Sequence, residues 1–237
     1  MLIIPIGGIG NRFRVEGYTI PKHLLTLKGK PILWHTINGF KKLLDNHQLV
    51  LILREEAYSM KEEYEKILAD LQIENYDIFF LGFSTRGQAE TVFEYTKNSK
   101  SDEEVYVFNA DSFYVDFPVP ELDVDGFLDT VNEEGNHWSF VAAENGKVTR
   151  VVEKERVSDN CSTGLYYFKS SDLFNEAYQN TYLGNVKSDL KEHYIAPIYN
   201  YMIARQQKVD FRLLSRDEIV FCGTPKEYEQ ELKKFGE

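Results

Sequence analysis

Short apolar runs alternate with segments of helical period over the first 110 residues, and this alternation restricts the fold more than any other feature. The runs are rich in β-branched and aromatic residues, and the segments between them place apolar residues such as Leu33, Ile37 and Phe40 on one helix face. Strands are predicted at 2–5, 49–53, 76–81 and 105–109, with helices at 31–44, 55–71 and 88–97 between them. Strand–helix alternation of this kind favours a largely parallel sheet covered by helices on both faces.

The rhythm changes after about residue 115. Strands are predicted at 138–143, 148–153, 165–168 and 209–214, with helices at 171–179, at 189–206 and from Pro225 onward. Because little helix separates the first three of these strands, this half of the sheet is expected to be antiparallel or mixed. No repeat, low-complexity stretch or linker is present, so residues 1–237 are predicted to form a single domain. The predicted fold class is α/β: a three-layer αβα sandwich around a Rossmann-like, mostly parallel but mixed sheet.

Charge and composition exclude several classes of protein. The net charge of -11 is opposite to that of most nucleic-acid-binding proteins, so no nucleic-acid partner is expected. The two cysteines, Cys161 and Cys222, lack the spacing of a metal site or a disulfide framework, which fits a reducing compartment. The sequence has no signal peptide and no run of about 18 apolar residues, which predicts a cytoplasmic protein without a membrane partner.

A glycine-rich loop at residues 7–12 follows the first predicted strand, in a region with a local excess of basic side chains. Backbone N–H groups of such a loop can bind phosphate oxygens, and glycine permits the close approach. The loop lacks the third glycine of a dinucleotide-binding fingerprint, because Phe13 stands there. Nor does a Walker A loop fit, since Gly29-Lys30 is followed by Pro31 instead of Ser or Thr.

A third phosphate-binding arrangement does fit, namely Gly8-x-Gly10-x-Arg12 followed by Pro21-Lys22. Further motifs accompany it in order along the chain. They are Gly17-Tyr18-x-x-Pro21-Lys22, Thr85-Arg86-Gly87-Gln88-Ala89-Glu90-Thr91-Val92, Phe108-Asn109-Ala110-Asp111, Val151-Val152-Glu153-Lys154, Ser162-Thr163-Gly164-Leu165-Tyr166 and Gly223-Thr224-Pro225. Together they resemble the sugar-phosphate nucleotidyltransferases, the NTP transferases that make nucleotide-sugars. The 17–22 motif is similar to the branch that serves capsule and cell-surface polysaccharides.

The resemblance implies a role for each matching residue. Nucleotide binding is implied for Gly7, Gly8, Gly10, Asn11, Thr85, Gly87 and Gln88. The implied catalytic residues are Arg12, which holds the β- and γ-phosphates, Lys22, which contacts the α-phosphate, and Asp111, which is also the ligand of a Mg²⁺ cofactor. Acceptor binding is implied for Glu153, Lys154, Thr163 and Gly164.

The implied reaction transfers a nucleoside monophosphate from an NTP to a phosphorylated small molecule and releases pyrophosphate. A pyrimidine donor (CTP, UTP or dTTP) and a sugar 1-phosphate acceptor are preferred, in capsule or surface polysaccharide biosynthesis. A phosphate monoester is already ionised at pH 7, so positioning and electrostatic stabilisation can supply the catalysis. Relatives often form dimers or tetramers, which makes a homo-oligomer compatible with the resemblance.

Three different functions also stay open. In the first, the enzyme is a cytidylyltransferase whose acceptor is a small non-sugar phosphate such as phosphocholine. In the second, the chain is a GT-A-like glycosyltransferase; Asp123-x-Asp125 resembles the D-x-D motif of that class. In the third, the chain is a catalytically silent nucleotide-binding module. The last is motivated by a departure, because relatives carry a metal-binding aspartate where this chain has Phe221. Asp217 and Glu218 are nearby acids that could replace it as Mg²⁺ ligands.

Overall fold

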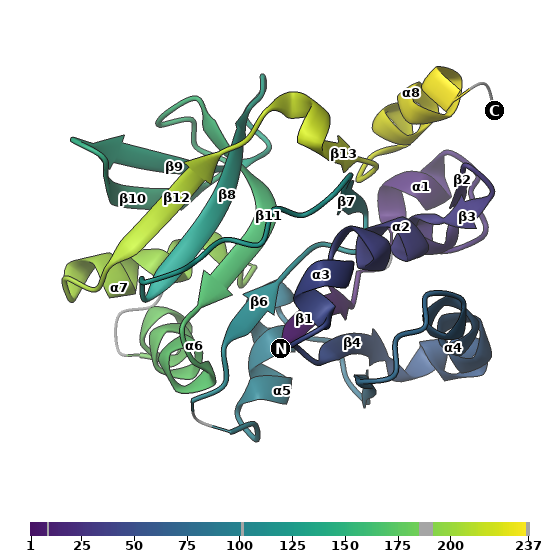
Figure 1. Cartoon of the computed structure of the whole chain (residues 1–237), viewed down its shortest axis with the longest axis horizontal. Coiled ribbons are helices and arrows are strands. Elements are labelled where there is room, and N and C mark those ends of the chain that lie inside the picture. Colours follow the sequence, from purple (N-terminus) through teal and green to yellow (C-terminus); the bar gives the residue numbers. More distant parts are fainter. Residues whose placement is uncertain (9, 101, 185–191, 236–237) are drawn as a thin grey trace.

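The computed structural model describes residues 1–8, 10–100, 102–184 and 192–235 (Figure 1). Its centre is a nine-stranded sheet whose main path runs β10-β9-β11-β6-β1-β4-β5. β8 joins this sheet by pairing with β11, and β12 joins it by pairing with β8. Within the described residues, no helix has the length and apolar character needed to cross a membrane.

The first half of the chain builds the parallel part of the sheet. β1 (Leu2–Ile6), β4 (Leu49–Arg54), β5 (Tyr76–Leu81) and β6 (Val105–Val107) pair in parallel in the order β6-β1-β4-β5. The elements between them include α2 (Ile32–Gly39), α3 (Lys41–Leu44), η2 (Glu55–Met60), α4 (Lys61–Asp70) and α5 (Gln88–Thr96). The predicted alternation is confirmed, except that the predicted helix 55–71 begins with the 3-10 turns of η2.

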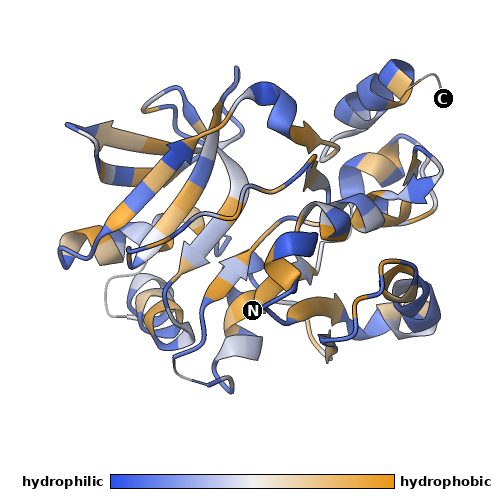
Figure 2. Cartoon of the chain, viewed as in Figure 1, coloured by the Kyte–Doolittle hydropathy of each residue, from blue (hydrophilic) through white to orange (hydrophobic). Residues whose placement is uncertain are grey.

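Alternate residues of the parallel strands fill two cores, one on each face of the sheet. Leu2 and Ile4 pack with α2, α3 and α4, whereas Ile3 and Val50 pack with α5 and with α6 (Ser171–Tyr178). This follows from the period of two along a strand. Figure 2 shows β1 and β4 in the orange of apolar residues, in contrast to the largely blue α4. A sheet between two layers of helices is the three-layer sandwich that the sequence predicts.

The second half of the sheet is mixed. β8 (Gly126–Asn132), β9 (Ser139–Glu144), β10 (Lys147–Glu153), β11 (Asn160–Phe168) and β12 (Val209–Leu213) form it. β11 runs antiparallel to β6, β8 and β9, whereas β12 runs parallel to β8. The sequence analysis missed β8, in which Asp129 interrupts the apolar pattern. Asp129 is fully buried, because Arg212 on β12 donates to both its carboxylate oxygens at 2.9 and 2.8 Å.

The predicted helix 189–206 is wrong in its first part. Residues 189–191 lie outside the described residues, 192–195 are not helical, and η4 (Ala196–Ile198) precedes α7 (Tyr199–Ala204). The backbone of His193 instead bonds to the turn before α5, with its N–H donating to Arg86 C=O at 3.0 Å. The last helix, α8 (Pro225–Phe235), begins as predicted.

Candidate active site

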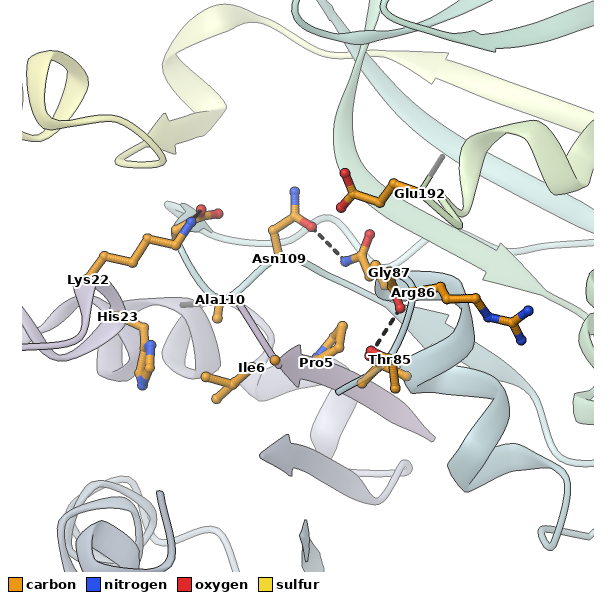
Figure 3. A pocket seen from close by; sticks show the side chains of 15 residues that line it. Pro5, Ile6, Lys22, His23, Thr85, Arg86, Gly87, Asn109, Ala110 and Glu192 are labelled. Carbon is orange, nitrogen blue, oxygen red and sulfur yellow. Dashed lines mark hydrogen bonds and ion pairs between the residues drawn. The ribbon is translucent and has the colours of Figure 1, made fainter. Parts of the chain in front are cut away.

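Two adjoining cavities open where the carboxyl ends of β1 and β6 meet the start of α5. The first, of about 480 Å³, lies between the glycine loop, the turn 85–88 and residues 109–111. The second, of about 290 Å³, extends from there toward β9, β10 and β11. The side chains common to both cavities are Lys22, Gln88, Asn109, Asp111 and Glu192. Figure 3 shows Lys22 and Glu192 approaching the first cavity from opposite sides, with Asn109 between them.

The implied site residues divide between these cavities. Gly7, Gly8, Thr85 and Gly87 line the first, Arg12, Glu153, Thr163 and Gly164 line the second, and Lys22, Gln88 and Asp111 line both. Gly10, Asn11 and Lys154 line neither cavity, although Asn11 and Lys154 directly neighbour the lining residues Arg12 and Glu153 in the sequence. The fold therefore gathers most of the implied residues at one place, from segments spread over the chain.

The glycine loop leads from β1 into α1 (Asn11–Val15). Gly10 adopts a φ of +64° just before this helix, a left-handed conformation that costs glycine little. A Cβ on Gly8 would meet no atom within 4 Å, so its backbone is open toward the cavity. The turn into α1 explains why Arg12 lies on the side of the second cavity.

Lys22 and Asp111 form an ion pair at the junction of the two cavities. Lys22 begins η1 (Lys22–Leu24), and Asp111 lies between β6 and β7 (Ser112–Tyr114). Their side chains are 27% and 16% exposed, so both can reach a ligand. His23, beside them, is buried with a ring nitrogen 2.9 Å from Tyr64 Oη. Burial, aided by the charge of Lys22, lowers the pKa of His23 to about 4, so its ring is neutral at pH 7.

The turn at residues 85–88, before α5, contacts His193, Asn109 and Thr91. A Cβ on Gly87 would lie 2.6 Å from His193 C=O, so only glycine fits beneath this segment. Gln88 Nε2 donates to Asn109 Oδ1 at 2.8 Å, a bond drawn in Figure 3. Thr85 Oγ1 lies 2.7 Å from Thr91 Oγ1. The result is a rigid edge of the first cavity.

Asn109 has no role assigned from the sequence, although it lies in the 108–111 motif. It contacts Gln88 on one side, and a Cβ on Gly164 would overlap its amide group on the other. Gly164 has a φ of +92° within an irregular stretch of β11, where the register with β8 shifts between Ser162 and Tyr166. Asn109 thus connects the turn before α5 to β11 and lines both cavities.

The second cavity combines carboxylates with aromatic rings. Glu153 accepts a hydrogen bond from Ser139 Oγ, and burial raises the pKa of Glu153. Lys154 Nζ lies 3.8 Å from Glu153 and donates to Tyr194 Oη, outside the lining of the second cavity. The sequence analysis also missed other lining residues, namely His137, Trp138, Glu192 and Tyr194. No local motif marks them, because only the fold brings them here.

A Mg²⁺ ion fits the oxygen donors at Asp111, since Mg²⁺ is commonly held by one or two carboxylates together with phosphate oxygens and water. Among the described residues, no group of three or more His, Cys, Asp or Glu side chains is arranged to hold a metal. Phe221 is 5% exposed and packs against Trp138, with ring centroids 4.9 Å apart. Asp217 and Glu218 line neither cavity, and Glu218 accepts from Ser215 N–H.

Known structures share this fold. The nucleoside-diphosphate-sugar pyrophosphorylase from Vibrio cholerae RC9 has a TM-score of 0.91 and 34% identity, covering 98% of this chain and 100% of that chain. The inositol-1-phosphate CTP transferase from T. maritima has a TM-score of 0.73 at 15% identity, and the match covers 100% of this chain and 96% of that chain. The latter identity supports the fold alone.

Curated proteins also match, although no family model does. The mannose-1-phosphate guanylyltransferase catalytic subunit beta of Xenopus tropicalis is 31% identical over 186 residues, which is 72% of this chain and 50% of that protein. The regulatory subunit alpha-A of this guanylyltransferase from Danio rerio is 30% identical over 194 residues, 70% of this chain and 44% of that protein. The chain thus spans about half the length of these curated relatives. With 34% identity over the whole of one relative, the chain belongs to the nucleotide-diphosphate-sugar pyrophosphorylase family of nucleotidyltransferases.

Proposed function

We propose that this chain transfers a nucleoside monophosphate from a pyrimidine NTP to a sugar 1-phosphate and releases pyrophosphate. The observation that supports this most is the Lys22–Asp111 ion pair at the junction of two cavities. One cavity is edged by the glycine loop and suits a triphosphate, and the other is edged by Glu153 and Thr163 and suits an acceptor. A cation and a carboxylate between them are placed to meet the reacting phosphates.

In the proposed step an acceptor phosphate oxygen attacks the α-phosphorus of the NTP. A new P–O bond forms, the bond to the bridging oxygen breaks, and pyrophosphate leaves with that electron pair. Lys22 donates to the α-phosphate oxygens. Arg12 lines the second cavity and not the triphosphate cavity, so it would stabilise the charge on the leaving pyrophosphate from that side of the junction. Asp111 would hold Mg²⁺, which neutralises phosphate charge when bound. No general base is required, because the attacking phosphate is already ionised.

The acceptor cavity favours a sugar over phosphocholine. A quaternary ammonium group is typically bound on open aromatic faces. Here Arg216 lies over the ring of Phe221 at 4.9 Å, and Lys154 lies over the ring of Tyr194 at 4.4 Å. The carboxylate of Glu153 and the hydroxyl of Ser139, in contrast, offer hydrogen bonds to sugar hydroxyl groups.

The donor base is proposed to be a pyrimidine, read by Gln88 beside Gly87. The relatives named guanylyltransferases make GTP the second candidate. The reaction is placed in the cytoplasm, in the synthesis of capsule or surface polysaccharide, with no nucleic-acid partner. We also propose that residues 1–237 act as one domain, as a homo-oligomer or alone, because one sheet includes strands from both halves of the chain.

A glycosyltransferase and a silent nucleotide-binding module both have less support. Asp123 and Asp125 line neither cavity, and both bond to Lys208, which disfavours a glycosyltransferase D-x-D motif. A silent module gains some support from the regulatory subunit among the relatives. The retained Lys22–Asp111 pair favours catalysis instead.

The test measures thermal stabilisation by CTP, UTP, dTTP, GTP and ATP with and without Mg²⁺, on wild type and Lys22→Ala. A ligand at about 100 times its Kd adds roughly 2.7 kcal/mol of stability. We expect one pyrimidine NTP to stabilise wild type more than the variant. A panel of phosphorylated acceptors is then screened for pyrophosphate release. Binding without release from any acceptor would favour the silent module, and no stabilisation by any NTP would contradict the proposal.

A further inference from the structure

Asp111 and Glu227 flank Gly223 at the edge of the second cavity. A Cβ on Gly223 would lie 3.3 Å from Asp111 Oδ2 and 3.6 Å from Glu227 Oε2. The missing side chain therefore leaves open a space between two carboxylates. Both acids line the second cavity together with Arg12 and Lys22, and Asp111 and Lys22 also line the first, so the space adjoins the junction where the phosphates are proposed to react.

Backbone hydrogen bonds keep both acids beside Gly223. At the end of β13 (Ile219–Phe221), Cys222 N–H donates to Asp111 C=O at 2.9 Å. At the start of α8, Thr224 N–H donates to Glu227 Oε2 at 2.8 Å, and Glu227 N–H lies 3.3 Å from Thr224 Oγ1. This capping box orders the Glu227 side chain.

We propose that Glu227 is the second carboxylate ligand of the divalent cation that Asp111 binds. Two carboxylates, phosphate oxygens and water are a ligand set that suits Mg²⁺. Phe221, on the strand before Gly223, offers no ligand, since its ring packs against Trp138. The inference rests on the proposed function, because the remaining ligands come from substrate phosphates.

The capping role of Glu227 can be separated from metal binding. The cap uses Oε2, which is also the Glu227 oxygen nearest the space beside Gly223, and a carboxylate oxygen that accepts one hydrogen bond keeps a second lone pair for a cation. Glutamine serves at this position of a capping box as well as glutamate does. Glu227→Gln therefore keeps the helix start and removes the negative charge.

The experiment titrates Mn²⁺ into wild type, Glu227→Gln and the control Asp217→Asn, and follows free Mn²⁺ by its EPR signal. Each titration is run on the protein alone and with UTP. Asp217 serves as the control because it is an acid ten residues before Glu227 in the sequence and its side chain lines neither cavity. We expect Glu227→Gln to weaken Mn²⁺ binding about tenfold or more, by comparison with the effect of losing groups that support a metal site. Asp217→Asn should bind as wild type does, and metal-free melting temperatures should match.

Equal Mn²⁺ affinity of wild type and Glu227→Gln, or an equal loss in Asp217→Asn, would overturn the inference. Binding of UTP and the other NTPs to wild type is measured separately, both with Mg²⁺ and in EDTA. If wild type binds no NTP under either condition, the proposed function fails, while the titration of the protein alone still decides whether Glu227 binds the cation. The two failures are therefore distinguishable.

Discussion

The two halves of the sheet meet at the site, but different kinds of contact shape them. On the nucleotide side, the glycine loop and the turn 85–88 are short segments at the ends of regular elements, set mainly by backbone geometry. On the acceptor side, the wall at Thr163 depends on side chains far away in the sequence. Thr163 Oγ1 lies 2.9 Å from Tyr114 Oη, which donates to Asp129 Oδ2 at 3.0 Å. The glycine loop is thus encoded locally and the turn 85–88 also has one remote backbone partner at His193, whereas the acceptor side depends on buried long-range pairs of side chains.

The largest expected effect is the loss of the ion pair behind the acceptor side. Arg212→Leu would leave the buried carboxylate of Asp129 without its cation, which costs about 3–5 kcal/mol of unfolding free energy. Urea denaturation measures this loss. As a control, Lys42→Leu removes the exposed pair with Asp116 and should cost under about 1 kcal/mol. Equal costs for the two variants would show that the acceptor side does not depend on this buried pair.

The next effect concerns the junction itself. Lys22→Ala and Asp111→Asn should each reduce pyrophosphate release by about 10²–10³ or more, because each removes electrostatic stabilisation from the reacting phosphates. Their melting temperatures should stay near that of wild type, since both side chains are partly exposed. Turnover within about tenfold of wild type in both variants would contradict the assignment of these residues.

The difference between local and long-range contacts also explains which strands and site residues can be predicted from the sequence. β1 is apolar throughout, β4 is apolar from Leu49 to Leu53, and β5 is apolar from Ile78 to Leu81, so the positions of these strands follow from local pattern. The motif residues Lys22 and Asp111 are likewise assigned to one site from the sequence, through resemblance. β8 was missed because the burial of Asp129 depends on Arg212, which lies in a strand far along the chain.

Two further features depend on distant partners that sequence reasoning does not see. The segment 192–195 is not helical, and the backbone of His193 in it instead forms hydrogen bonds with Arg86 in the turn before α5 and with Ala89 in the first turn of α5. Glu192, next to His193 in this segment, lines both cavities. The local period of apolar residues predicts a helix or strand well where the contacts that stabilise it lie within the same segment. It fails where a residue's hydrogen-bond or ion-pair partner lies far away in the sequence.

A pH effect of intermediate size is expected on the nucleotide side. His23 stays neutral in the folded chain down to about pH 4, whereas in the unfolded chain it binds a proton below about pH 6.5. Because the unfolded state binds more protons in this range, stability falls as pH drops from about 6.5 toward 4. The loss at pH 5 is about 2 kcal/mol, and His23→Gln should lack it. Urea denaturation at pH 7 and pH 5 compares the two; an equal loss of stability in both proteins would contradict the burial argument.

The smallest expected effects come from Gln88 and Glu153, and they compare binding of the NTP with binding of the acceptor. Gln88→Ala should weaken NTP binding about five- to tenfold, the size expected for about one hydrogen bond. Because Gln88 also lines the second cavity, KM for the sugar phosphate should change by a smaller factor. Glu153→Gln should do the reverse, because its carboxylate lines only the second cavity. Calorimetry gives the NTP affinity, and pyrophosphate release at saturating NTP gives KM for the acceptor. Gln88 bonds to Asn109, and Asn109 packs against Gly164, so some coupling between the sides is built in. If each variant changes both constants equally, the two cavities act as one binding unit, and the division into a local and a long-range side holds for folding but not for recognition.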